Sequence, residues 1–197
     1  MTESAAGEAD AVLDFWFGAP GSAEFGSTRK AWFAKDDAFD ALIRERFGAL
    51  IERALRGELE GWADEPRSAL AQILLLDQFT RNAYRATARA FAGDARALAA
   101  ASRMVGARRD EALAPFMRAF VYLPFEHAEG LAMQDEAIRL FYRLVKEAPE
   151  CADMLDYAHR HRAVIERFGR FPHRNEILGR QSTAEEIAFV KQPGSGF

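Results

Sequence analysis

Cysteine is almost absent from this chain of 197 residues, in which Cys151 is the single example. One thiol cannot form an intrachain disulfide, and such cysteine usage is typical of a reducing compartment. No catalytic motif surrounds Cys151, so we expect a buried or inert thiol and not a nucleophile. The N-terminal segment also lacks the basic and apolar regions of a secretory signal, and together these features predict a cytoplasmic protein.

Long apolar runs and a basic charge balance are missing as well. The longest strongly apolar run, ILLL at residues 73–76, is far too short to cross a bilayer. The formal net charge is -4, which gives the chain no overall attraction to nucleic acid or to anionic membranes. We therefore expect neither as a partner, and the sequence leaves the oligomeric state open.

The alternation of apolar and polar residues that marks a strand is absent, and helical periodicity fills most of the chain. Helices are expected over residues 8–17, 36–56, 66–82, 93–106 and 115–146, from the segment after 150 to 168, and over 184–191. Pro124 should kink or break its helix, because proline cannot donate to the helical ladder. Ser182 and Glu185 have the spacing of a capping box before the last helix.

These helices predict an all-α fold. Hydrophobic residues make up 49% of the chain, enough for a sizeable core. Short connections between successive helices are typical of stacked antiparallel helix pairs. We expect a single domain over residues 1–197, with residues 192–197 as a flexible tail.

Polar residues follow directly on a buried helical stretch in LLLDQFTRN, residues 74–82. Asp77 and Arg81 are spaced to pair on one helical face, and Gln78 and Asn82 lie beside them. A charge next to a buried stretch must be paired or must face a cavity, because isolated burial is costly. The segment is therefore either a structural ion pair or one wall of a polar pocket.

Two further segments supply histidines and carboxylates. In YLPFEHAEG, residues 122–130, Glu126 and His127 are candidates for an acid–base pair, unless His127 is a core histidine. In YAHRHRAVIERF, residues 157–168, His161 falls on the apolar face of the helix and His159 falls off it. His161 is then either a core histidine that is hydrogen-bonded to a carboxylate or carbonyl, or the partner of Asp77 or Glu126 in a shared cavity.

The segment RFGRFPHRNEILGR, residues 167–180, gathers positive charge and aromatic rings. Arg170, His173, Arg174 and Asn175 supply hydrogen-bond donors, and guanidinium groups suit carboxylates and phosphates. Asn175 is also placed to cap a short helix whose N–H groups would favour an anion. The alternative is that these arginines clamp carboxylates of the chain itself, including Asp77 and Glu126.

Motifs for metals and cofactors are missing. The chain has no phosphate-binding glycine loop, no dinucleotide fingerprint and no nucleophile elbow. Its histidines lack zinc spacing, and His159, which would complete a helical carboxylate–histidine pattern, is expected to face outward. We therefore expect neither a metal nor a cofactor.

Five segments together carry a family resemblance: FWFG (15–18), WFAKDDAFD (32–40), LLLDQFTRN (74–82), YLPFEH (122–127) and FGRFPHRNEILGR with STAEE (168–186). Over essentially the whole chain they resemble a bacterial family of uncharacterised proteins, domain of unknown function 924. The resemblance implies an all-helical, tetratricopeptide-like fold, and it implies no activity, substrate or cofactor. It points to the same polar residues, and the spacing to VIERFGRF favours His161 over His159.

Three functions remain open at this point. The favoured one is the binding of a small anionic ligand or an acidic peptide end in a polar pocket, with these candidate ligand-binding residues: Asp77, Gln78, Arg81, Asn82, His127, Arg170, Arg174 and Asn175. The second is a hydrolase or lyase, in which Glu126 or His161 acts as the base and Arg170 and Arg174 stabilise negative charge, with His173 as a further catalytic candidate. The third is an ion-pair network that only fixes how the helices pack.

Overall fold

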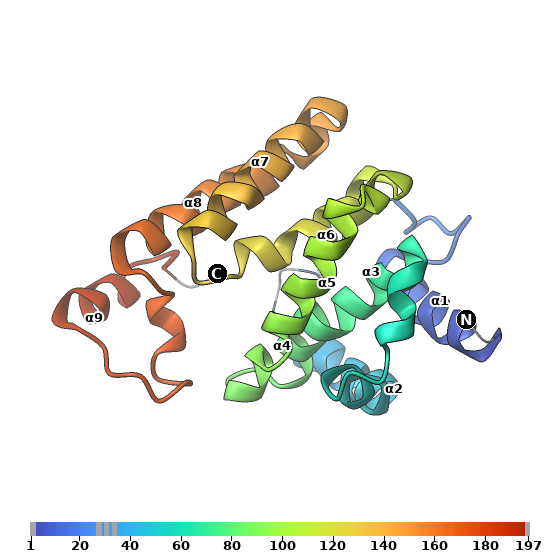
Figure 1. Ribbon diagram of the computed structural model, residues 1–197. Helices are drawn as coiled ribbons and strands as arrows, with labels where there is room; N and C mark the ends of the chain where they lie inside the picture. The colour runs from blue at the N-terminus through green and yellow to red at the C-terminus, as the bar shows by residue number, and fades with distance from the viewer. Residues whose placement is uncertain (1–2, 27–28, 30–31, 33–34, 196–197) are drawn as a thin grey trace.

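The structure, a computed structural model, describes residues 3–26, 29, 32 and 35–195 (Figure 1). Parts of two segments singled out in the sequence lie outside the described residues: the motif WFAKDDAFD and the C-terminal tail. Every regular element of the described part is helical. In chain order they are α1 (Glu3–Phe17), α2 (Asp37–Leu55), η2 (Glu60–Asp64), α3 (Pro66–Leu74), η3 (Leu75–Phe79), α4 (Thr80–Ala83), η4 (Ala88–Phe91), α5 (Asp94–Gly106), η5 (Arg109–Ala112), α6 (Pro115–Glu126), α7 (Leu131–Glu147), η6 (Pro149–Cys151), α8 (Ala152–Phe168), η7 (Pro172–Arg174) and α9 (Ala184–Val190).

Over much of the chain, helices that are close in sequence also pack against one another. Helix α3 packs against α1, α5 and α6, and α7 packs against both α6 and α8. Figure 1 shows α6, α7 and α8 running side by side in alternating directions. The core between the helices is rich in aromatic side chains, and these large ones are fully buried: Trp16, Phe17, Phe79, Phe120 and Phe141. Each stabilises the fold by about 1.5–3 kcal/mol through removal of apolar surface from water.

Helix ends follow the expected local chemistry with one shift. Asp36 caps α2 and accepts hydrogen bonds from the backbone N–H groups of Ala38 and Phe39. The capping box before α9 consists of Thr183 and Glu186, one residue later than the predicted Ser182 and Glu185. The two pairs have the same spacing, and the choice falls on Glu186 because its carboxylate also pairs with an arginine of the preceding loop.

The predicted interruption at Pro124 is wrong in its position. Helix α6 continues through Pro124 to Glu126, and the chain leaves the helix only at His127, whose N–H still donates to Leu123 O at 2.9 Å. A proline near the end of a helix removes a single hydrogen bond, so the helix tolerates it there. Residues 127–130 then separate α6 from α7.

A wide turn that the sequence did not predict interrupts the helix after α3. Residues Leu75–Phe79 form a π-helical turn, all of it buried, between α3 and α4. The backbone carbonyl of Leu76 in this turn meets the start of α5 at Gly93, where a Cβ atom would lie 2.1 Å from Leu76 O. Only glycine fits this approach, which brings Asp77 and the N-terminus of α5 to one place. Such π turns often mark functional sites.

Candidate functional site

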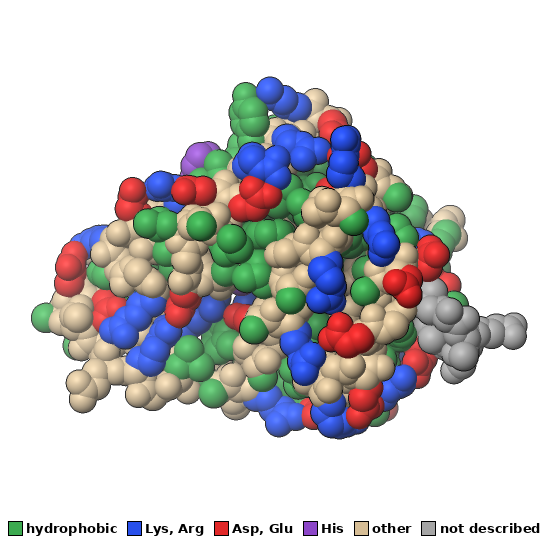
Figure 2. All heavy atoms as spheres, in the orientation of Figure 1, with side chains coloured by type: hydrophobic (Ala, Val, Ile, Leu, Met, Phe, Trp, Pro, Cys, Tyr) green, Lys and Arg blue, Asp and Glu red, His purple; other side chains and the backbone are tan. Residues whose placement is uncertain are grey.

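A cavity of about 360 Å³ lies where the start of α5, the end of α6 and the C-terminal segment meet. It is lined by Ala88, Phe91, Ala92, Asp94, Ala95, Leu98, Pro124, His127, Ala128, Glu129, Arg174 and Leu178. Figure 2 shows this side of the molecule hollowed between the C-terminal segment and the α4–α5 region, with Lys and Arg side chains gathered beside the hollow. The walls therefore combine apolar surface with three charged side chains and one imidazole, a composition typical of ligand sites.

Asp77 anchors the polar floor of this region. Its Oδ1 atom lies 2.7 Å from Nδ1 of His127 and 3.0 Å from Nη1 of Arg81, and its Oδ2 accepts a hydrogen bond of 2.6 Å from Gln78 Nε2. Burial by itself would raise the pKa of this carboxyl, but Arg81 and His127 outweigh burial and hold the pKa well below its ordinary value. Asp77 is therefore a fixed negative charge at neutral pH, and the expected pairing with Arg81 is present.

His127 stays neutral despite that negative neighbour. Burial, followed by the charge of Arg81, lowers the pKa of His127 below its ordinary value of 6.5 against the opposite effect of Asp77. Because Asp77 accepts at Nδ1, the proton of the neutral ring sits on Nδ1, and Nε2 carries the lone pair.

Asp94 is shared by two arginines from different parts of the chain. Arg81 donates to both of its oxygens, at 2.9 and 3.2 Å, and Arg174 donates to Oδ2 at 3.3 Å. The fork of Arg81 thus satisfies Asp94 with good geometry, and Arg174 adds a long third contact.

Of the three charged side chains in the cavity wall, Arg174 makes the fewest hydrogen bonds. Its guanidinium lies between the rings of Phe91 and Phe171, 4.7 and 4.5 Å from their centroids. Within the described part of the chain Asp94 receives its one hydrogen bond, and its buried Nε atom has no partner. Burial, together with the charge of Arg81, lowers the pKa of Arg174 to about 10. The single long contact with Asp94, a carboxylate that Arg81 already holds, is weak compensation for an arginine buried to this extent.

Glu129, the other acid in the wall, is fully engaged. Arg180 donates to both of its oxygens, at 2.6 and 3.0 Å, and the N–H of Phe171 donates to Oε1 at 2.8 Å. Although burial acts in the opposite direction, Arg180 and the Phe171 N–H hold the pKa of Glu129 below its ordinary value. Glu129 therefore ties the C-terminal segment to the end of α6 and has little capacity left for a ligand.

Glu126 and His161 pair with each other and are not among the residues that line the cavity. The Nδ1 atom of His161 lies 2.9 Å from Glu126 Oε1 and 2.9 Å from Tyr157 O, and both side chains are almost completely buried. Of the two partners considered for His161, the structure selects Glu126. Glu126 and His127 do not act on one point, because consecutive side chains point in different directions.

Three other predicted residues serve the architecture of the C-terminal segment and do not line the cavity. Arg170 forms a two-bond pair with Glu186, at 2.6 and 2.9 Å, and donates to Gln181 O. Asn175 accepts from Arg180 and donates to Ser182, so the expected helix cap is wrong: residues 176–179 form a turn. His173 is half-buried next to the ring of Phe171, and burial lowers its pKa to about 4.

Asn82 and Gln78 do not line the cavity either, and each has a partner in the fold. Asn82 Nδ2 donates to Asp40 Oδ1 at 2.7 Å, and Arg85 pairs with the same carboxylate at 2.7 Å, so Asn82 fixes α2 against α4. Gln78 supports Asp77 and reaches no other partner in the described part. Of the predicted ligand-binding residues, His127 and Arg174 line the cavity, and Asp77, Gln78 and Arg81 hold them in place.

Three residues that line the cavity were not predicted from the sequence: Asp94, Phe91 and Glu129. In the sequence, Asp94 is an ordinary acidic residue in the first turn of a helix, where the helix dipole stabilises its negative charge. The one available signal was Gly93 directly before it, a glycine at a point where the helical pattern needs no special backbone freedom.

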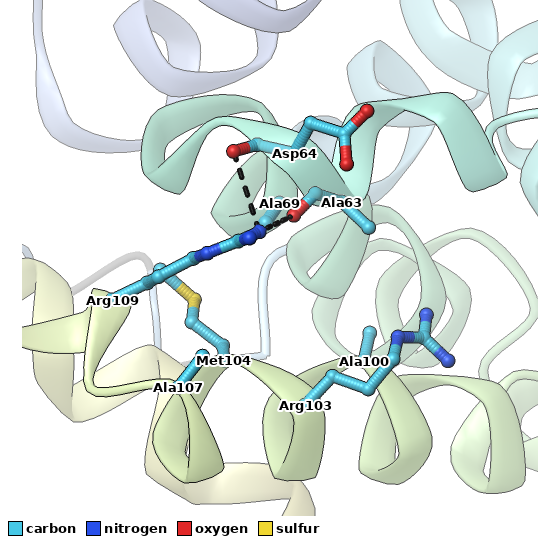
Figure 3. A pocket seen from close by; sticks show the side chains of 8 residues that line it. All are labelled: Ala63, Asp64, Ala69, Ala100, Arg103, Met104, Ala107 and Arg109. Carbon is cyan, nitrogen blue, oxygen red and sulfur yellow. Dashed lines mark hydrogen bonds between the residues drawn. The ribbon is translucent and has the colours of Figure 1, made fainter.

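A second cavity, of about 260 Å³, lies between η2, α3 and the end of α5 (Figure 3). Arg109 points across it and donates to the carbonyl oxygens of Ala63 and Asp64, at 2.8 and 3.3 Å. Its guanidinium is thus already used to join η5 to η2. None of the residues predicted from the sequence lies here, and the larger cavity is the better candidate site.

Among the described residues, no cluster of three or more histidines, cysteines, aspartates or glutamates has an arrangement that could hold a metal ion. None of the described helices combines the length and the apolar character needed to cross a membrane.

Comparison with known proteins shows the family to which the chain belongs. The family described as "Bacterial protein of unknown function (DUF924)" matches residues 12–194. A solved structure of a protein of unknown function, ATU0120 from Agrobacterium tumefaciens, is 40% identical and superposes with a TM-score of 0.82, over 94% of this chain and 98% of that one. No curated protein matches the chain. The match spans all elements that build the cavity, and the chain belongs to the DUF924 family of bacterial proteins.

Proposed function

We propose that the protein binds a small anion, a carboxylate or a phosphate, in the cavity between α5, the end of α6 and residues 172–178. The observation that carries the proposal is Arg174, a guanidinium only 6% exposed, stacked between two phenylalanines and left with one long hydrogen bond. The N–H donors of a guanidinium lie in its plane, so those that Asp94 does not engage point outward from the edge of the group. A bidentate anion matches that edge in shape and charge.

The neighbouring charges favour an anion over a cation. Asp94 and Glu129, the acids of the wall, are held by the two-bond forks of Arg81 and Arg180. A cationic ligand would have to displace one of these arginines, whereas an anion adds a partner that Arg174 lacks. The volume of about 360 Å³ suits a small molecule, which we favour over an extended peptide.

The stacking of α6, α7 and α8 in alternating directions supports a second part of the proposal, the tetratricopeptide-like arrangement that the family resemblance implies. Helix-pair scaffolds present concave surfaces, and the cavity lies where α6 meets the C-terminal segment.

A thermal-shift series with phosphate, pyrophosphate, L-malate, succinate and citrate tests the binding. At one hundred times its Kd a ligand stabilises the folded chain by about 2.7 kcal/mol, which raises Tm by roughly 5–10 °C at this chain length. Arg174→Met should abolish the rise. Arg167→Met is the matched control, because Arg167 also lies over an aromatic ring, that of Phe168, but is exposed and outside the cavity.

The same variants separate binding from a purely structural role. A buried guanidinium with one long ion-pair contact contributes little stability, so Arg174→Met should leave the free energy of unfolding within about 1 kcal/mol of the parent chain. An unchanged Tm with every anion in the parent chain, or an equal rise in Arg174→Met, contradicts the proposal. A loss of several kcal/mol in Arg174→Met without ligand would assign Arg174 to the architecture instead.

A further inference from the structure

His127 and Asp77 have an arrangement that goes beyond binding. The imidazole Nδ1 and the carboxylate Oδ1 lie 2.7 Å apart, and the histidine belongs to the wall of the cavity that also holds Arg174. Asp77 is 1% exposed and receives further contacts from Arg81 and Gln78, so its position is fixed from several sides. A histidine held at Nδ1 by a fixed carboxylate has its ring orientation and its tautomer determined.

The other ring nitrogen has no protein partner. Within the described part of the chain, Nε2 of His127 makes no hydrogen bond, and it is not among the buried polar atoms that lack one. The side chain of His127 is 14% exposed. A lone pair on Nε2 is therefore available at the cavity, which is the requirement for a general base.

We propose that His127 and Asp77 form a general-base dyad that acts on a hydroxyl group of the anion bound at Arg174. This inference rests on the proposed binding function, since Arg174 supplies the anchor. In the proton transfer the O–H bond breaks, its electron pair stays on oxygen, and the proton forms a new bond to Nε2. The imidazolium so formed faces Asp77, whose charge stabilises it, and Asp77 is a positioning residue without contact to the ligand.

Burial and the positive charge of Arg81 favour the neutral, proton-accepting form of His127 before reaction, and they outweigh the carboxylates of Asp77 and Glu126, which favour the charged ring. Arg81 faces it across Asp77, the ring of His161 lies 6.2 Å from its own, and Glu126 precedes it in the chain. The lowered pKa of His127 agrees with this arrangement, because a base must be unprotonated at neutral pH to accept a proton.

Histidine NMR and chemical modification of the full chain test the dyad without knowledge of the substrate. A long-range proton–nitrogen spectrum near neutral pH should show His127 with its proton on Nδ1. Diethyl pyrocarbonate should acylate His127 at Nε2, which peptide mass mapping can assign. A proton on Nε2, a charged ring, or a His127 that resists the reagent while exposed His159 reacts would overturn the proposal.

Asp77→Asn identifies the role of the carboxylate. An amide can donate to Nδ1 and transfer the ring proton to Nε2, so we expect acylation of His127 to slow at least tenfold, together with a change of tautomer. Asp40→Asn is the matched control, because Asp40 is also buried and paired with an arginine but lies outside the cavity, and it should change the rate less than twofold. Equal rates in all three proteins would show that Asp77 does not set the tautomer, and the dyad would be wrong. If Asp77→Asn fails to fold, the tautomer of the parent chain still decides the question.

Protection experiments separate this inference from the binding proposal. Phosphate or L-malate at a concentration that raises Tm should slow acylation of His127 in the parent chain and not in Arg174→Met. A Tm rise that depends on Arg174 but gives no protection would sustain anion binding and refute the dyad's action on the bound anion. If no anion raises Tm in a way that depends on Arg174, the binding function is wrong, and so is the proposal that His127 acts on an anion bound there. The tautomer of His127 would then stand as a separate observation.

Discussion

Arg174 Nη1 donates to Asp94 Oδ2 at 3.3 Å, and this contact joins residues that lie 80 positions apart in the chain. It closes the cavity between the start of α5 and the C-terminal segment. Because Arg81 holds the same carboxylate more closely, Asp94 is mainly the partner of Arg81, and Arg174 keeps donors for a ligand.

Asp94→Asn should weaken folding and strengthen anion binding at once. Arg81 loses its carboxylate in a partly buried setting, so we expect a loss of about 1–3 kcal/mol in the free energy of unfolding. Arg174 loses its counter-charge, so its affinity for phosphate should rise by about tenfold, equivalent to roughly 1.4 kcal/mol. Urea unfolding and calorimetric titration measure the two effects. Asp10→Asn, which removes an exposed pair with Arg67, should change both by less than about 0.5 kcal/mol.

Arg170→Met should destabilise the C-terminal segment without affecting the cavity. Arg170 is the partner of Glu186, whose side chain is almost fully buried and whose pKa Arg170 lowers to about 2. Removal should reduce the free energy of unfolding, because the carboxylate stays behind without its partner. Hydrogen exchange of α9 and urea unfolding check this. Arg167→Met, next to it on the surface, should lie within about 0.5 kcal/mol of the parent, and a loss of anion binding in Arg170→Met would contradict this assignment.

Gly93→Ala should be among the most damaging single substitutions in the chain. The added Cβ would meet the backbone carbonyl of Leu76 at 2.1 Å, and neither backbone can move without shifting the π turn or α5. We expect a loss of about 3 kcal/mol or more, measured by urea unfolding. Gly106→Ala in the same helix is the control, since a Cβ there meets nothing within 4 Å. Its effect should be neutral or stabilising by up to about 0.5 kcal/mol.

Stability should fall as the pH drops below the ordinary pKa of histidine. Burial lowers the pKa of His173 to about 4 from 6.5, so the unfolded chain takes up a proton that the folded chain refuses. The stabilisation is complete above pH 6.5 and is lost progressively down to about pH 4, with roughly 2 kcal/mol gone at pH 5. The lowered pKa of His127 acts with the same sign.

Urea unfolding at pH 7.5 and pH 5 measures this dependence. His173→Gln should reduce the difference between the two pH values by about 2 kcal/mol. His159→Gln should not, because His159 is exposed and has no such burial. A pH dependence that is identical in the parent and in His173→Gln would show that His173 titrates normally in the folded chain.

Much of the helical architecture follows from local rules. The three- and four-residue spacing of apolar side chains gave α2 and α5 to within about two residues, and Pro66, Pro115 and Gly169 mark helix boundaries as expected. The position of the interruption could not be predicted from Pro124, because a proline indicates the loss of one local hydrogen bond and does not indicate how close the helix is to its end. The π turn at Leu75–Phe79 has no local signal at all, since it depends on the packing of Gly93 against Leu76.

The sequence by itself determined that the chain is helical, that Asp77 and Arg81 pair within one helix, and that arginines and histidines gather near the C-terminal end. Only the tertiary structure decided which of them meet. Arg170 turns to Glu186 and Arg174 to the cavity, although both come from one short loop. The reason is physical: which partner a charged side chain takes depends on distances across the fold between residues far apart in sequence, and the helical period carries no information about those distances.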